Sequence, residues 1–199
     1  MRKNIETGIL LGLICAIILS VAKFDVACED LRHGVLRLHI IANSDSLEDQ
    51  QLKLKVRDEI LKNSDSLFDT ATDLETAIIC AQEKKEEIIE ISNMVLAESG
   101  KNYNALAYVG ETYFETREYE DFTLPAGEYT SLIVKLGKAE GKNWWCVVYP
   151  AVCLPAADGA DLSESVSQKG TAVAKNPKKY IMRFKIVEWY ENFKTKRKK

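Results

Sequence analysis

The stretch that decides the fold is residues 33–42, with the sequence HGVLRLHIIA. Apolar residues alternate in it with Arg37 and His39, which is typical of a β-strand that places one face on a hydrophobic core. The polar run Asn43-Ser-Asp-Ser46 follows directly, and short polar side chains of this kind accept hydrogen bonds from the free amides of a first helical turn. The sequence therefore predicts a strand, a turn and a helix over residues 47–62.

The middle of the chain predicts a second helix and then a sheet. The 47–62 helix has apolar residues on two sides, so we expect it to pack against both the sheet and another helix. That second helix is predicted over residues 73–98, where apolar residues recur at helical spacing and neither glycine nor proline interrupts them. β character follows in four stretches, at residues 103–109, 113–119, 129–136 and 143–149.

Turn signals set the expected topology of these strands. Pro125-Ala-Gly127 predicts a turn before the third stretch, and the two glycines within residues 137–142 predict a hairpin loop between the last two stretches. The element order indicates an α+β fold in a single domain, with a first strand, two helices and then a mainly antiparallel sheet.

The C-terminal part of the chain gives weaker signals. Residues 156–179 are polar and poor in large apolar groups, so a flexible excursion is expected there. Over residues 180–193, alternating apolar residues favour a strand that runs into a short helix. A helix is the alternative, because four apolar residues also recur at helical spacing, namely Met182, Ile186, Trp189 and Phe193. The basic tail, residues 194–199, is either a solvated disordered end or a segment attracted to an anionic membrane surface.

The N-terminal residues 1–22 predict export. Arg2 and Lys3 precede an uncharged apolar run over residues 8–22, whose length suits the hydrophobic region of a signal peptide. Small residues at the end of this run fit cleavage before Lys23, and an uncleaved signal anchor is the alternative. Either route exports residues 23–193, which we expect to form the functional body.

Composition excludes several classes of protein. The chain has 199 residues, of which 46% are hydrophobic and 29% charged, as in globular proteins, so a wholly disordered chain is excluded. The formal net charge is −3, although five of the last six residues are basic, so the body is acidic. An acidic body lacks the basic face that phosphate contacts require, and no nucleic-acid partner is expected.

The cysteines indicate a disulfide rather than a metal or redox site. Cys146 and Cys153 flank Pro150, and a turn there could bring them within bridging distance; two buried free thiols are the alternative. Outside the cytosol such a bridge would persist. The sequence contains neither a CxxC motif nor a Cys/His cluster, so no metal and no cofactor are predicted.

Few residues suit catalysis. His39 could act as a base, but no nucleophile elbow of the GxSxG type is present, and the histidine fits better as a partly exposed sheet residue with a polar partner. The acidic residues near Asp45 fit the negative charge favoured at the start of a helix. Trp144 and Trp145 are adjacent in a predicted strand, so they point to opposite faces. Either both faces are covered or one ring is an exposed interface anchor.

Two blocks of sequence resemble a known family. The first is LRLHIIANSD at residues 36–45, continued by Asp49-Gln50 and by LKLKVRD at residues 52–58. The second comprises LPAGEY at residues 124–129 and GKNWWCVVYP at residues 141–150, with Cys153 after it. These blocks resemble stage II sporulation protein R.

The resemblance implies a signalling function and no enzymatic activity. Such proteins are exported from the forespore into the space between the forespore and the mother cell. There they activate a membrane-embedded, aspartic-type protease of the mother cell, which processes the sigma-E precursor. The alternative is an exported cell-envelope hydrolase that uses the carboxylates near Asp45. The resemblance supplies no binding residues, so physical reasoning alone selects the candidate partner-binding residues, which are His39, Asn43, Asp45, Trp144 and Trp145.

Overall fold

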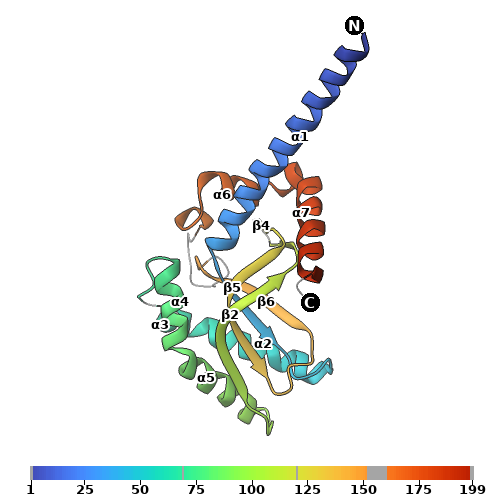
Figure 1. The fold of residues 1–199 in the computed structure, drawn as a ribbon. Coiled ribbons are helices and arrows are strands. Elements are labelled where there is room, and N and C mark those ends of the chain that lie inside the picture. Colours follow the sequence, from blue (N-terminus) through green and yellow to red (C-terminus); the bar gives the residue numbers. More distant parts are fainter. Residues whose placement is uncertain (1, 69, 120, 152–160, 198–199) are drawn as a thin grey trace. The chain divides into compact units, whose positions relative to one another are not determined.

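The structure is a computed structural model that describes residues 2–68, 70–119, 121–151 and 161–197. The chain divides into two compact units (Figure 1). We call the first the helical unit; it comprises Met1–His33, Phe114–Gly127 and Val166–Lys199. We call the second the sheet unit; it comprises Gly34–Tyr113 and Glu128–Ser165.

A four-stranded sheet forms the centre of the sheet unit. Its strands are β2 (Ala105–Phe114), β5 (Gly127–Leu136), β1 (Leu36–Ile41) and β6 (Asn143–Tyr149), in that spatial order. β1 pairs with β5 in parallel and with β6 in antiparallel fashion. The predicted α+β class is therefore confirmed, although the sheet is mixed rather than purely antiparallel.

The predicted hairpin between β5 and β6 is wrong, because β1 lies between these two strands. Two strand spacings amount to about 10 Å, a distance that a six-residue connection spans easily. Residues 137–142 thus cross the end of β1 instead of closing a hairpin. As an inner strand, β1 is buried on both faces: Arg37 is 0% exposed, with its guanidinium 4.7 Å from the centre of the Tyr129 ring, and His39 is 7% exposed. His39 is therefore not the partly exposed sheet residue that one interpretation of the sequence suggested.

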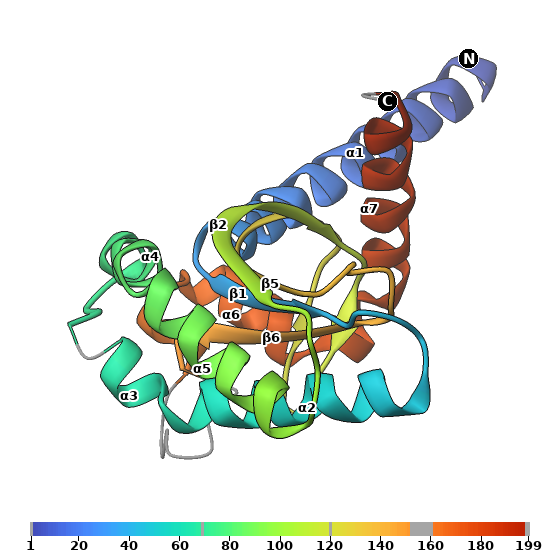
Figure 2. The same ribbon diagram turned by 90° about the horizontal axis from the view of Figure 1, so that it is seen from below.

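Helices cover one face of the sheet (Figure 2). They are α2 (Leu47–Lys62), α3 (Ser64–Leu67), α4 (Leu74–Glu83) and α5 (Lys85–Glu98). As predicted, α2 packs on both β1 and α5. The core between these layers is aliphatic, and its fully buried members include Leu36, Leu38, Ile40, Val56, Ile88, Leu132 and Val134.

The single helix expected over residues 73–98 is wrong, because the chain turns at Lys84 between α4 and α5. Ala81 and Ile88 are buried on the core side of the two helices. The intervening positions that would continue this apolar stripe are Lys84 and Lys85. A lysine gains nothing from burial without a partner, so the apolar stripe that would hold one long helix against the core is interrupted there.

The helical unit contains α1 (Arg2–His33), α6 (Gln168–Lys175), α7 (Pro177–Arg197) and a short antiparallel pair, β3 (Arg117–Glu118) and β4 (Thr123–Leu124). The first part of α1 is exposed and apolar, and residues Asn4–His33 are long and apolar enough to cross a membrane. This helix fits a signal peptide or a membrane anchor. After the predicted cleavage point, α1 continues and buries apolar side chains in the unit, namely Phe24, Ala27, Cys28 and Leu31.

The flexible excursion expected near residues 156–179 is corrected where the structure describes it. Residues 162–164 form a 3-10 turn and α6 follows, with its first turn capped by Ser167, whose Oγ accepts a hydrogen bond from the Gly170 N–H at 3.3 Å. A Cβ atom at Gly170 would lie 2.6 Å from a carboxylate oxygen of Asp30 in α1. Small residues such as Gly170 thus let α6 approach α1 closely. The low content of large apolar residues in this segment therefore reflects close helix packing rather than a flexible loop.

The strand expected within residues 180–193 is also wrong, because α7 is helical throughout. Phe184 and Val187 are buried on its inner side. The helical stripe noted in the sequence lies in solvent, and we call its four residues the outer face of α7: Met182, Ile186, Trp189 and Phe193. Residues 194–197 form the last turn of this helix instead of a separate tail, and residues 198–199 lie outside the described residues.

Candidate functional site

The candidate site begins at the turn from β1 into α2, residues 43–49, which we call the β1–α2 corner. Asn43 links three segments there. Its Nδ2 donates to Asp49 Oδ2 at 2.8 Å, its Oδ1 accepts from the backbone N–H of Lys138 at 3.0 Å, and its carbonyl accepts from the N–H of Glu140 at 3.2 Å. Asn43 therefore ties the end of β1 to α2 and to the loop after β5.

Asp49 is the buried centre of the corner, with only 5% of its surface exposed. Besides Asn43, it accepts hydrogen bonds from Ser44 Oγ at 2.6 Å and from the Tyr103 hydroxyl at 2.8 Å, and Lys101 Nζ lies 3.9 Å from Oδ1. Burial alone would raise the pKa of Asp49, but these hydrogen bonds favour the charged form more strongly and lower it to about 2. The carboxylate is therefore ionised at neutral pH and surrounded by donors.

The loop over residues 137–142 rests directly on the corner. The Gly141 N–H donates to the carbonyl of Ala42 at 2.9 Å, and the Lys142 N–H donates to Asp45 Oδ1 at 2.7 Å. A Cβ atom at Gly141 would lie 2.2 Å from the carbonyl oxygen of Ser44, so only glycine permits this approach. Asp45 therefore holds the loop in place across the end of β1.

A buried lysine completes the network. Lys53 is 5% exposed, and its Nζ donates to Gln50 Oε1 at 2.7 Å and to the carbonyl of Lys142 at 2.8 Å. Burial lowers the pKa of Lys53, and the nearby negative charge of Asp45 opposes that shift. The corner and the loop are thus joined by charged and neutral hydrogen bonds that satisfy the buried groups.

The two tryptophans lie on opposite faces of β6, as the sequence predicts. Trp145 is opposite His39 across the β1–β6 pair, with the two ring centres 6.0 Å apart. Trp144 is opposite Ile40 and packs on the core, and the Arg57 guanidinium lies 5.2 Å from its ring centre. Both indole rings are half-buried, so neither full burial nor a fully exposed anchor describes them.

The surroundings of His39 favour the neutral form of its imidazole. Burial lowers its pKa most strongly, and the positive charges of Arg37 and Lys135 act in the same direction, while a hydrogen bond with Asn143 opposes them. At neutral pH the imidazole is uncharged, and it lies in the interior of the sheet unit.

The structure thus separates the five candidate residues into two sets. Asn43 and Asp45 come together as anchors of one loop, whereas His39 and Trp145 form a cross-strand pair with Trp144 on the other face of β6. Sequence reasoning missed the central role of Asp49 and the roles of Lys53 and Tyr103. One signal for Asp49 was its position three residues after the N-cap Ser46, whose Oγ accepts from the Asp49 N–H at 3.2 Å.

The described residues offer little for metal or thiol chemistry. In the ranges that the structure describes, no group of three or more His, Cys, Asp or Glu side chains could hold a metal ion. Cys146 is disulfide-bonded, and the free thiols among the described cysteines are Cys15, Cys28 and Cys80. Cys153, the predicted partner of Cys146, lies outside the described residues.

The Pro125–Gly127 turn has a structural role in the helical unit. Arg32 is buried there, and its Nε donates to the carbonyl of Ala126 at 3.0 Å. A Cβ atom at Gly127 would lie 2.3 Å from the same Nε. Glu29 and Asp25 pair with this guanidinium from the same helix. The turn and the loop over residues 137–142 therefore both use glycine for a close approach.

Known proteins match this part of the chain. The family model described as stage II sporulation protein R matches residues 32–158, which include the corner, the loop and the Pro125–Gly127 turn. Stage II sporulation protein R of Bacillus subtilis (strain 168) is 34% identical over 137 residues, or 68% of this chain and 61% of that protein, so the chain spans less than two thirds of this relative's length. No solved structure matches the chain. The chain belongs to the stage II sporulation protein R family, and its role lies in sporulation.

Proposed function

We propose that this chain is a signalling protein without catalytic activity that activates a membrane-embedded, aspartic-type protease of the mother cell. The activated protease removes the pro-sequence from the sigma-E precursor. The observation that carries this proposal is the family match over residues 32–158, which contains both sequence blocks that resemble the family. The alternative, an envelope hydrolase, has no comparable support.

The state of the carboxylates supports a function without catalysis. A general acid must hold a proton at working pH, whereas the pKa of Asp49 is lowered to about 2. Asp49 accepts from three donors, and Asp45 accepts from the backbone of the loop. These two carboxylates, which the hydrolase alternative would need, are engaged in holding the corner together.

The mechanism we propose is a shift of the protease toward its active, dimeric state. A ligand can shift such an equilibrium only if it binds the active state better than the inactive one. A rigid binding surface lowers the entropy lost on binding, and the hydrogen bonds of the corner give the loop over residues 137–142 that rigidity. The loop carries exposed charged side chains at Lys138, Glu140 and Lys142, which suit contact with a polar partner.

This proposal places Asn43 and Asp45 behind the binding surface, as residues that position the loop. His39 is buried, so it contributes to this proposal only by packing against Trp145. Trp145 and Trp144 remain proposed contributors through the exposed parts of their half-buried rings. We further propose that the chain acts in the space between the forespore and the mother cell. The apolar start of α1 supports export, either as a cleaved signal or as an anchor.

Co-expression in a host that does not sporulate tests the proposal. The host would produce the protease and the sigma-E precursor, with or without this chain, and precursor cleavage would be followed by immunoblot. We expect cleavage only when the chain is present, and no cleavage when residues 2–22 are deleted, because that variant lacks the export segment. Cleavage that proceeds without the chain, or that occurs with the chain but without the protease, would overturn the proposal.

A further inference from the structure

The outer face of α7 is a large apolar surface exposed to solvent. Its members recur at intervals of four, three and four residues, so they line one side of the helix. Met182 is 75% exposed and Trp189 is 69% exposed, and the rings of Trp189 and Phe193 stack with their centres 6.1 Å apart. Soluble proteins rarely leave such a row of large apolar side chains in water unless it binds something.

Charge is distributed unevenly around this helix. At about 100° per residue, Lys178 and Lys185 lie along one flank of the outer face and Lys179 lies along the other. All three lysines are exposed. The acidic residues of α7 lie on the opposite side, where Glu191 is buried and Glu188 is half-buried. The side of α7 that faces solvent is therefore apolar and positively charged.

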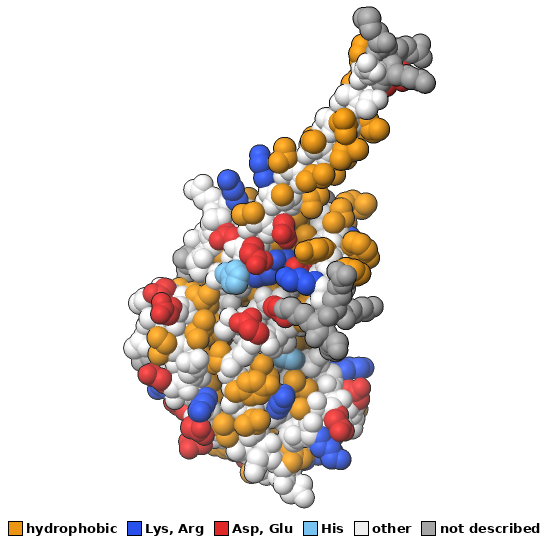
Figure 3. Space-filling view, in the orientation of Figure 1, with side chains coloured by type: hydrophobic (Ala, Val, Ile, Leu, Met, Phe, Trp, Pro, Cys, Tyr) orange, Lys and Arg blue, Asp and Glu red, His pale blue; other side chains and the backbone are white. Residues whose placement is uncertain are grey.

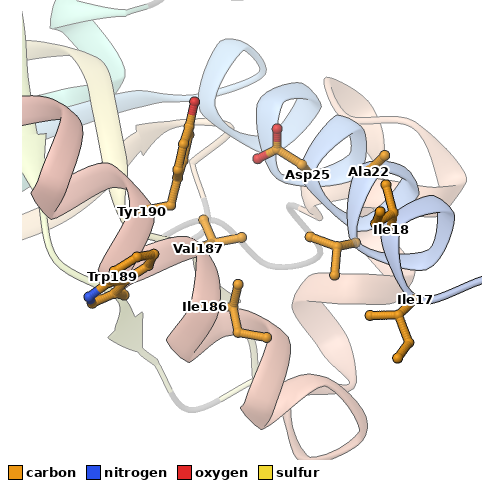
Figure 4. A pocket seen from close by; sticks show the side chains of 9 residues that line it. Ile17, Ile18, Ala22, Asp25, Ile186, Val187, Trp189 and Tyr190 are labelled. Carbon is orange, nitrogen blue, oxygen red and sulfur yellow. The ribbon is translucent and has the colours of Figure 1, made fainter. Parts of the chain in front are cut away.

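A groove joins this surface to the apolar segment of α1 (Figure 4). It has a volume of about 390 Å³ and lies within the helical unit. Ile17 and Ile18 of α1 line it on one side, and Ile186 and Trp189 of α7 line it on the other. In Figure 3, hydrophobic side chains run along α1 and gather again beside its lower part.

The groove lies at the end of the apolar run of α1. Beyond Ala22 the helix becomes polar at Lys23, and Ser20 accepts a hydrogen bond from Arg183 of α7 at 2.8 Å. Trp189 and Tyr190 therefore lie beside the point where apolar surface gives way to polar surface. Tryptophan and tyrosine favour this level in proteins that contact membranes, because the ring is apolar and one edge forms hydrogen bonds.

We propose that the outer face of α7 binds the surface of an anionic phospholipid bilayer, with its apolar side chains at the boundary between the headgroups and the acyl chains and the flanking lysines facing phosphate groups. An apolar stripe with aromatic residues and basic flanks is the pattern of helices that lie in the membrane interface. A second copy of the chain fits less well, because two such faces in contact would bring the lysine flanks together. This inference goes beyond the proposed function because it assigns a lipid ligand to a helix outside the matched residues 32–158.

Tryptophan fluorescence in vesicles tests this assignment. The full chain carrying Trp144→Phe and Trp145→Phe retains Trp189 as its single reporter. It is reconstituted in vesicles of phosphatidylcholine and phosphatidylglycerol, with part of the phosphatidylcholine brominated on its acyl chains. We expect the bromolipid to lower Trp189 fluorescence about twofold or more, because the ring lies at the acyl boundary. The matched variant Trp189→Phe, which retains Trp144 and Trp145, should keep its fluorescence.

Charge variants separate contact by α7 from mere tethering by α1. Lys178→Glu, Lys179→Glu and Lys185→Glu combined in the reporter chain should remove most of the quenching, since their negative charges repel the anionic surface. The matched control combines Lys55→Glu, Lys85→Glu and Lys138→Glu, which change the net charge equally on the sheet unit, and it should keep the quenching. Circular dichroism checks that both variants are folded.

Three outcomes would overturn the assignment. In the first, Trp189 is quenched by aqueous acrylamide in the vesicles and not by the bromolipid. In the second, both triple variants are quenched to the same extent as the parent, so that α7 has no electrostatic attraction to the lipid. In the third, Trp189 is shielded without lipid and sedimentation shows a dimer, which would make the face a contact between copies.

Discussion

The β1–α2 corner and the outer face of α7 both hold unusual residues, but in opposite physical states. In the corner, polar and charged side chains are buried, and Asp49 and Lys53 each meet several partners inside the sheet unit. On the outer face of α7, large apolar side chains lie in solvent. Removing a buried partner destabilises a fold, whereas removing an exposed apolar side chain does not. The comparison therefore separates residues that hold the shape from residues that remain available for binding.

The largest expected effect follows the loss of the central carboxylate. Asp49→Ala leaves Asn43, Ser44 and Tyr103 without their common acceptor and should lower the free energy of unfolding by about 3 kcal/mol or more. Urea titration of the full chain followed by circular dichroism measures this change. The matched control is Glu48→Ala, which removes an exposed carboxylate paired with Lys101 and should cost less than about 1 kcal/mol. Equal losses in the two variants would contradict the structural role of the corner.

The next effect concerns the close approach of the loop. Gly141→Ala places a Cβ atom against the carbonyl of Ser44, so the loop must move and the free energy of unfolding should fall by about 2 kcal/mol. Gly110→Ala is the matched control, because its Cβ would meet only side-chain atoms at ordinary distances and should leave stability within about 0.5 kcal/mol. If the Gly141 variant were as stable as the parent, the loop would not rest on the corner as described.

Acid should weaken the corner in a defined pH window. The pKa of Asp49 is lowered in the folded chain from its ordinary 3.8 to about 2, so the ionised form stabilises the fold above about pH 4. This stabilisation is lost as the pH falls through about 2, and it amounts to roughly 2 kcal/mol. Unfolding free energies of the parent and of Asp49→Asn between pH 5 and pH 2 check it. The difference between them should shrink toward acid, and a constant difference would contradict the shift.

The smallest effect is expected on the outer face of α7. Trp189→Ala removes a ring that is 69% exposed, so the free energy of unfolding should change by less than about 0.5 kcal/mol. The same urea titration measures it beside Asp49→Ala. A loss comparable to that of Asp49→Ala would mean that Trp189 belongs to a core, and the contrast between the two regions would fail.

Local patterns predicted the elements of the sheet unit better than their pairing. β1 and β6 were predicted within a few residues, because the alternation of apolar and polar side chains is a local signal. The pairing of β1 with both β5 and β6 was missed, because a local pattern does not show which strand lies inside the sheet. The buried β1 requires an inner position, and a six-residue loop is long enough either to close a hairpin or to cross a strand.

The C-terminal helix was missed for a different reason. Apolar residues at positions 182, 184 and 186 alternate as in a strand because α7 is apolar on both its inner and its outer side. A helix with two apolar faces gives no clean helical period, so sequence alone could not choose between the two structures. Only the exposure of Met182 and the burial of Phe184 reveal that one apolar face packs in the unit while the other lies in solvent.

The choice of partner-binding residues stays a prediction, but the structure shows which contacts these residues make. Polar density at Asn43 and Asp45 did mark a special corner of the fold. The sequence could not show that the loop over residues 137–142 would satisfy both side chains, because almost a hundred residues separate the hydrogen-bonded partners. Hydrogen bonds from Lys142 to Asp45 and from Lys53 to Lys142 join the two blocks of sequence that resemble the family.

Reconstitution tests the central claim, activation of the protease, most directly. Purified protease is placed in vesicles of phosphatidylcholine and phosphatidylglycerol with the sigma-E precursor, and the rate of precursor cleavage is measured as the full chain is added. The account predicts cleavage that rises with the amount of chain and saturates, with no cleavage by the chain alone. Cleavage at an unchanged rate as the chain is added, or cleavage by the chain in vesicles without protease, would contradict it.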